Sequence, residues 1–254
     1  MHILEKKIRD ANLQDRYALI PFLTAGFPDR DRFWNALHEL DDNGADILEI
    51  GVPFSDPVAD GPVVEDASRR ALESGINLAE ILKGLSDRKG QFKAGIVLMG
   101  YFNPFLQFGL KCLVSEAKNA GVHGLIIPDL PYEEMVSVKE EIGNDIALIP
   151  LVGPNTTEQR MKLYVDIGQG YVYVVSVMGV TGERANLAPQ VSNTMIRARS
   201  VFKLPLALGF GLKEPKQLEV LASEAKPDAA VFGSALLKEL DQGKSAKDFI
   251  SRWK

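Results

Sequence analysis

Cysteine is almost absent from the 254-residue sequence, and histidine is scarce. The single cysteine, Cys112, excludes an intrachain disulfide, which favours a reducing compartment. Because Cys112 falls on one face of an expected helix, we predict that it packs into the core. Of the three histidines, His2 is near the N-terminus, His38 falls on a helix, and His123 precedes a strand. A histidine-rich zinc site is therefore not expected, and we predict no metal ligand.

The sequence also lacks long apolar runs and an excess of positive charge. No stretch approaches the roughly 18 apolar residues that span a bilayer. The net charge is -5 and the pI is near 5.4, so no basic face is available for nucleic acid or an anionic membrane. The first residues, MHILEKKIRDANLQ, resemble neither a signal peptide nor a transit peptide. We therefore expect a cytoplasmic protein, or a plastid-stromal one if it is plastid-encoded.

Apolar segments typical of strands alternate with helical patterns along the chain. After a short leading helix, the expected strands are 18–24, 47–52, 95–99, 124–127, 147–152, 171–176, 205–209 and 229–232. The helices expected between and after them are 29–43, 63–75, 78–87, 109–120, 133–142, 156–167, 191–201, 215–223, 235–240 and 246–253. Strict alternation predicts a parallel sheet, and eight units in this length predict a single α/β domain, 1–254, a (β/α)8 TIM barrel with long βα loops. A doubly wound open sheet is the alternative.

One expected strand carries a carboxylate. In DILEIGVPFSDPVADGP (46–62), strand alternation places Ile47, Glu49 and Gly51 on the same face. A charged residue inside a strand is costly unless it is solvated, paired or used. A barrel has no edge strand, and its active site lies at the C-terminal strand ends, so Glu49 becomes a candidate acid or base. The alternative is a glutamate on the helix-facing side that pairs with a lysine or arginine.

Glycine follows three successive expected strands near the end of the chain. GVTG at 179–182 follows the sixth strand, GFG at 209–211 the seventh, and Gly233-Ser234 the eighth. Each of these glycine-containing segments alone is typical of a tight turn. Together they predict a phosphate site, because glycine lets backbone N–H groups approach an anion and the start of a helix attracts it.

Lysine is missing from the interior of the expected strands, which leaves a Schiff-base aldolase without an obvious nucleophile. Lys93 precedes the third strand, at the opposite end of a barrel from the active site. With a Schiff-base lysine and a zinc site not expected, the chemistry that remains is acid–base catalysis by carboxylates on a small phosphorylated substrate.

Several motifs together resemble the tryptophan synthase alpha subunit family. They are FSDPVADGP after ILEIGVP, LMGYFNP, PDLPYEE, SVMGVTG and the closing GFG and GSA, and the resemblance runs from about Leu19 to Leu237. It implies a lyase that cleaves indole-3-glycerol phosphate to indole and glyceraldehyde 3-phosphate. It also implies a partner, the beta subunit, in an alpha2-beta2 assembly. The resemblance places pyridoxal phosphate (PLP) in that partner and no cofactor in this chain.

The resemblance also assigns roles to individual residues. Its catalytic pair matches Glu49 and Asp60, although Asp56 could compete with Asp60. Glu65 departs from the family, which usually has glutamine there. The remaining assignments are substrate contacts at Phe22, Tyr173, Thr181, Gly182, Gly211, Gly233 and Ser234, and a partner face at Asp56, Pro57, Asn103, Pro104, Phe105 and Pro131.

The residue chemistry is compatible with these roles. A glutamate with a raised pKa could move protons at the bond that breaks, and an ionised Asp60 could stabilise a cationic indole nitrogen. Phe22 and Tyr173 could wall the indole ring or simply pack the core. The loops 53–62 and 179–189 are expected to act as lids, and Phe105 is expected to be an apolar loop residue covered by the partner.

Two alternatives stay open at this point. One is another phosphate-binding barrel enzyme of aromatic amino-acid biosynthesis. The other is a non-catalytic relative, which should lack a carboxylate at position 49 or 60. A stand-alone, indole-releasing lyase would carry out the same cleavage without a partner.

Overall fold

All the strands of the described sheet run parallel to their neighbours. The computed structural model describes residues 1–175, 187–209 and 211–253. The strand order is β5-β4-β3-β2-β1-β9-β8-β7-β6, so the first and last strands of the chain lie side by side. The strands are β1 Ala18–Thr24, β2 Ile47–Gly51, β3 Gly95–Met99, β4 Gly124–Ile126, β5 Ala147–Leu148, β6 Leu151–Val152, β7 Val172–Val175, β8 Leu206–Gly209 and β9 Ala229–Phe232.

The ninth strand arises because one barrel strand is interrupted. β5 and β6, the two ends of the strand order, are separated only by Ile149 and Pro150. The Ile149 N–H donates to the Leu125 carbonyl at 3.0 Å, whereas the Pro150 carbonyl accepts from the Tyr173 N–H at 2.9 Å. Proline has no N–H to donate, which explains the break. The chain thus closes the ring through one broken strand, and the predicted eight-unit barrel is confirmed.

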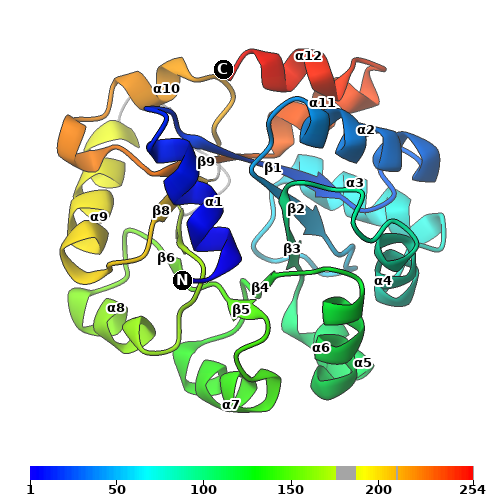
Figure 1. The fold of residues 1–254 in the computed structure, drawn as a ribbon, viewed down its shortest axis with the longest axis horizontal. Helices are drawn as coiled ribbons and strands as arrows, with labels where there is room; N and C mark the ends of the chain where they lie inside the picture. The colour runs from blue at the N-terminus through cyan, green and yellow to red at the C-terminus, as the bar shows by residue number, and fades with distance from the viewer. Residues whose placement is uncertain (176–186, 210, 254) are drawn as a thin grey trace.

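Helices surround the strands (Figure 1). Most lie where the sequence predicts them, but α5 replaces part of an expected loop, and the helix expected at 215–223 is only α10 and the short 3-10 helix η2. The helices are α1 Ile3–Asn12, α2 Arg30–Asp42, α3 Pro62–Glu73, α4 Leu78–Ser86, α5 Phe102–Phe108, α6 Leu110–Asn119, α7 Tyr132–Ile142, α8 Glu158–Val165, α9 Leu187–Val201, α10 Lys216–Glu219, η2 Ser223–Ala225, α11 Ser234–Asp241 and α12 Ala246–Ser251.

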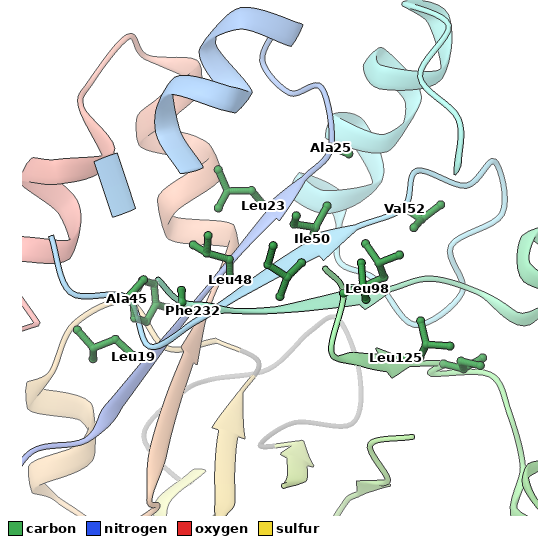
Figure 2. Packing of buried hydrophobic residues seen from close by; sticks show 14 of the residues in the cluster. Leu19, Leu23, Ala25, Ala45, Leu48, Ile50, Val52, Leu98, Leu125 and Phe232 are labelled. Atoms are coloured by element: carbon green, nitrogen blue, oxygen red, sulfur yellow. The ribbon is translucent and has the colours of Figure 1, made fainter. Parts of the chain in front are cut away.

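Strand alternation divides the core into two layers. Leu23, Leu48 and Ile50 belong to the outer layer, on the side of the strands that faces the helices (Figure 2). Phe22 and Ile47 belong to the inner layer, inside the barrel. Because neighbouring residues of a strand point to opposite faces, one strand supplies both layers.

Helix α1 closes the N-terminal end of the barrel. Its residue Leu4 is fully buried in the inner layer. A Cβ atom at Gly95 would lie 2.6 Å from Leu4 Cδ2, and one at Gly124 would lie 2.9 Å from Leu4 Cδ1. These two glycines therefore make room for Leu4, and the barrel is left with one mouth, at the C-terminal strand ends.

Two expectations from the sequence concern the burial of Cys112 and the absence of a membrane-spanning helix. Cys112 is exposed on α6, so the prediction that it packs into the core is wrong. None of the helices in the described ranges is long and apolar enough to cross a membrane.

Candidate active site

Glu49 lies at the centre of the inner layer. Its Cα is in register with that of Phe22 on β1, and both residues belong to the face that points into the barrel. The side chain is 0% exposed, and neither carboxylate oxygen has a hydrogen-bond partner among the described residues. Glu49 therefore does not pair with a lysine or arginine behind the sheet. A buried, unpaired carboxyl group is costly to ionise, which suits a group that donates a proton.

The pKa of Glu49 is raised to about 8. Burial is the larger cause, and the negative charge of Asp60 is the second. Both disfavour the carboxylate form. Glu49 is therefore protonated at neutral pH, deep in the barrel mouth.

Asp60 reaches the same region from the loop between β2 and α3. Its side chain is half-buried, and the Tyr101 hydroxyl donates a hydrogen bond to Asp60 Oδ2 at 3.1 Å. The pKa of Asp60 is raised to about 6, because burial and the charge of Glu65 raise it and the Tyr101 hydrogen bond only partly offsets them. Asp60 is therefore mostly ionised at pH 7 while Glu49 is protonated. Two carboxyl groups with separated pKa values are typical of acid–base sites.

Asp56 does not share this position. It is exposed, and its carboxylate accepts a hydrogen bond from the neighbouring Ser55 hydroxyl. Because Asp56 is exposed and its carboxylate is bonded to the neighbouring residue, it is less suited than Asp60 to act in the barrel mouth.

Aromatic side chains line the inner wall around Glu49. Phe22 packs so closely that a Cβ atom at Gly51 would lie 2.6 Å from its Cζ, and one at Gly233 would lie 2.7 Å from its Cδ1. Tyr173 lies against Gly209, where a Cβ atom would come within 2.2 Å of the hydroxyl oxygen. Glycines at these positions thus leave room for the rings of Phe22 and Tyr173 beside the strand ends.

Two tyrosines that the sequence interpretation did not single out also belong to this region. Tyr171 lies two residues before Tyr173, and its fully buried hydroxyl has no partner among the described residues. Burial and the charge of Glu49 raise the pKa of Tyr171 and of Tyr173. Tyr101 is the second omission, and its place just beyond the end of β3, within LMGYFNP, is the signal that could have identified it.

The predicted phosphate end is only partly described. Gly233 immediately follows β9 and precedes α11, whose first residue is Ser234. Gly211 follows β8 with φ of +93°, a conformation that favours glycine, and has open space on the side where a Cβ would project. These three residues lie at adjacent strand ends, with the first turn of α11 beside them. Thr181 and Gly182 lie outside the described residues.

The predicted partner face is exposed at most of its positions, with one correction. Asp56, Asn103 and Pro131 are exposed, and Pro57 and Pro104 are half-buried. The prediction that Phe105 is an exposed loop residue is wrong, because it lies in α5 and is 0% exposed. A Cβ atom at Gly100 would lie 2.6 Å from Phe105 Cζ, so this ring anchors α5 against the end of β3. The exposed large apolar side chains near this face are Val58, in the loop before α3, and Leu106, in α5, at 85% and 51% exposure.

Metal ligation has no geometric basis in the part of the chain that is described. No group of three or more histidine, cysteine, aspartate or glutamate side chains there could hold a metal ion. The polar groups and surfaces that the described site offers are the separated carboxyl groups, the tyrosines and the glycine-lined strand ends.

Comparisons with known proteins agree with this arrangement. The family model described as tryptophan synthase alpha chain matches residues 8–252. The tryptophan synthase alpha chain of Desulfovibrio desulfuricans is 66% identical over 255 residues, covering 100% of each chain, and that of Nitratidesulfovibrio vulgaris is 57% identical over 251 residues, covering 98% and 97%.

Solved structures give the same result. The alpha subunit from Legionella pneumophila superposes with a TM-score of 0.85 at 30% identity, covering 98% of this chain and 94% of the other. A chain of Mycobacterium tuberculosis tryptophan synthase superposes with a TM-score of 0.86 at 31% identity, covering 99% and 95%. With the barrel and the family match in agreement, this chain belongs to the tryptophan synthase alpha chain family.

Proposed function

We propose that Glu49 and Asp60 together cleave indole-3-glycerol phosphate in this chain. The reaction, which yields indole and glyceraldehyde 3-phosphate, is the alpha reaction of tryptophan biosynthesis and follows from the family. One observation carries the assignment of residues. Glu49 and Asp60 face the same barrel mouth with pKa values of about 8 and about 6, so one is an acid while the other is an anion.

The proposed reaction begins with a proton from Glu49. This proton adds to C3 of the indole ring, and the positive charge that results is shared by the indole nitrogen. The carboxylate of Asp60 stabilises that charge, because a fixed anion in a partly dry site interacts strongly with a developing cation.

Bond cleavage then restores the starting state. Glu49, now a carboxylate, takes the proton from the hydroxyl group on the carbon attached to C3. The C–C bond breaks as the aldehyde forms, and its electron pair returns to the ring, which neutralises the indole nitrogen. Glu49 ends protonated as it began, so it serves as acid and then base in one turnover.

Substrate binding is assigned to the wall and the glycine-bearing strand ends. Phe22 and Tyr173 offer flat aromatic faces to the indole ring. Gly211, Gly233 and Ser234 offer backbone N–H groups and the start of α11 to the phosphate. Thr181 and Gly182 are part of the same proposal by resemblance alone.

A beta subunit is proposed as the partner, in an alpha2-beta2 assembly that carries PLP in the beta subunit. The face that includes Asp56, Pro57, Asn103, Pro104 and Pro131 is proposed to contact it. The solved relative from Mycobacterium tuberculosis is described as tryptophan synthase, which supports a paired subunit without giving its stoichiometry here. A cytoplasmic location is proposed from composition.

The decisive experiment compares Glu49→Gln with Glu116→Gln in an indole-release assay. Glu116 is an exposed residue of α6, so its substitution changes the same chemical group away from the site. We expect the cleavage rate of Glu49→Gln to fall by about 10²–10⁴-fold, the usual contribution of a general acid, and the rate of Glu116→Gln to stay unchanged. A folded Glu49→Gln protein that cleaves at the wild-type rate would refute the assignment.

A further inference from the structure

Tyr101 has a fixed main chain at the mouth of the barrel. It is 3% exposed and immediately precedes α5. On one side, the Gly100 N–H donates to the Ile126 carbonyl at 3.0 Å, and on the other, the Phe102 N–H donates to Asp129 Oδ1 at 2.9 Å. These bonds tie the backbone around Tyr101 to the neighbouring β4 unit, so its side chain projects from a rigid base.

The side chain of Tyr101 holds the loop 53–61 at three points. Its hydroxyl accepts a hydrogen bond from the Ala59 N–H at 2.9 Å and donates one to Asp60 Oδ2 at 3.1 Å. Its ring stacks on Phe54 with centroids 5.2 Å apart and an interplanar angle of 29°. One residue therefore contacts the beginning and the end of the loop that carries Asp60.

The loop has little else to hold it in place. Its internal hydrogen bonds are local, from the Val58 N–H to the Asp56 carbonyl and from the Asp60 N–H to the Pro57 carbonyl. Within the described chain, the side-chain hydrogen bonds between loop residues 53–60 and the rest of the protein are the two made by Tyr101. Because Asp56 and Val58 are exposed, burial contributes little to the position of the loop tip.

We propose that Tyr101 is a positioning residue for the cleavage reaction, whose hydroxyl holds the loop 53–61 against the barrel mouth and keeps the Asp60 carboxylate aimed at the substrate as an anion. This inference rests on the proposed role of Asp60. Tyr101 acts through Asp60 and need not touch the reacting atoms.

The charges around Asp60 explain why this hydroxyl matters. The titratable groups that face Asp60 in the described chain are Glu49 from β2, Glu65 from α3, Tyr173 from β7 and Tyr101. Glu65 and burial favour the neutral form of Asp60, whereas the hydrogen bond from Tyr101 favours the anion. Burial and Asp60 also raise the pKa of Tyr101, so the phenol stays protonated and remains a donor throughout the neutral range.

The first test is hydrogen exchange at the Ala59 amide, measured on the full-length chain. Tyr101→Phe removes the hydroxyl and keeps the ring that stacks on Phe54. The control is Tyr164→Phe, which removes the hydroxyl of a buried α8 residue and keeps the ring that packs edge-on against Tyr132. We expect at least roughly tenfold faster exchange at Ala59 in Tyr101→Phe and no change in the control, because the amide loses its acceptor. Unchanged exchange at Ala59 would overturn the proposal.

The second test is the kinetics of the same variants with indole-3-glycerol phosphate. We expect Tyr101→Phe to lower kcat roughly tenfold with a smaller change in KM, and to move the acidic limb of the pH profile to higher pH. A purely structural role would not move that limb. Wild-type kcat and pH profile in a folded Tyr101→Phe protein would contradict the positioning role.

A third variant keeps the test valid if the phenylalanine variant folds poorly. Replacement of Tyr101 by 3-fluorotyrosine preserves the hydroxyl and makes it a stronger donor. The acidic limb should then move to lower pH, opposite to Tyr101→Phe, and no movement would count against the proposal. If wild-type protein fails to cleave the substrate, the proposed function fails, whereas exchange at Ala59 still decides whether Tyr101 holds the loop.

Discussion

Glu49 and Asp60 belong to one strand–loop unit, yet their carboxyl groups hold opposite protonation states at pH 7. The pKa of Glu49 is about 8 because it is fully buried and feels the charge of Asp60. The pKa of Asp60 is about 6 because burial is partly offset by the Tyr101 hydrogen bond. A strand and the loop that follows it thus deliver an acid and an anion to the same place.

The first prediction concerns the pH dependence of cleavage. Activity needs protonated Glu49, which is lost as pH rises through about 8, and ionised Asp60, which is lost as pH falls through about 6. We therefore expect a bell-shaped profile of kcat/KM with its maximum between these values. The measurement is initial indole release from pH 5 to pH 9.5. A rate that keeps rising above pH 9 would contradict a protonated Glu49.

The second prediction concerns stability and needs no substrate. The pKa of Glu49 is higher in the folded chain than in the unfolded chain, so its carboxyl group favours folding at low pH and opposes it as pH rises. Glu49→Gln removes this dependence. We expect the Tm of Glu49→Gln minus that of wild type to increase between pH 5 and pH 8, by roughly 2–4 °C or more. The same difference for Glu116→Gln should stay flat, and a flat result for Glu49→Gln would refute the buried acid.

The third prediction concerns Glu65, the departure from the family pattern. Glu65 lies in the first turn of α3, and its charge raises the pKa of Asp60. Glu65→Gln should lower the pKa of Asp60 and move the acidic limb of the pH profile to lower pH by up to about one unit. Glu73→Gln, at the other end of the same helix, is the control and should leave that limb in place. Superimposable profiles for Glu65→Gln and wild type would show that this charge is screened by solvent.

The fourth prediction concerns the phosphate end. Gly211 has φ of +93° and Gly121 has φ of +80°, and both have open space where a Cβ would project. Substituting alanine at either position therefore imposes similar backbone strain, but Gly121 precedes β4 at the opposite end of the barrel. We expect Gly211→Ala to raise KM more than it lowers kcat, by roughly tenfold. Gly121→Ala should leave KM unchanged, and an equal KM in both variants would argue against phosphate binding at Gly211.

The fifth prediction concerns the proposed partner. Because Phe105 is buried, its substitution would disturb α5 itself, and Leu106 is the informative residue. We expect a beta subunit to raise indole production tenfold or more, if closing the loops contributes about 1.4 kcal/mol. Leu106→Asp should weaken this increase and keep the basal rate, whereas Leu163→Asp on α8, where the side chain is similarly exposed, should behave as wild type. Full stimulation of Leu106→Asp would place the interface elsewhere.

Sequence periodicity determined the order of strands and helices and the inner face of β2. Ile47, Glu49 and Gly51 alternate with apolar neighbours, and alternation is a local property that requires no knowledge of distant contacts. The same local logic located Gly233 before α11 and Asp60 in a loop at the C-terminal strand ends. Local patterns could not determine the break in the barrel strand at Pro150. The break depends on hydrogen bonding to two different neighbours, because β5 pairs with β4 and β6 pairs with β7.

Tertiary structure alone decided which side chains are buried and what they touch. Phe105 is core and Leu106 is surface because α5 forms where the sequence predicts a loop, and a helix places consecutive residues on different faces. Cys112 is exposed for a related reason, since the face of α6 that is buried is set by its packing against the barrel. The hydrogen bond from Tyr101 to Asp60 joins residues 41 apart in the chain, and no spacing rule predicts such a contact. The pKa values that separate Glu49 from Asp60 depend on burial and neighbouring charge, which exist only once the barrel has closed.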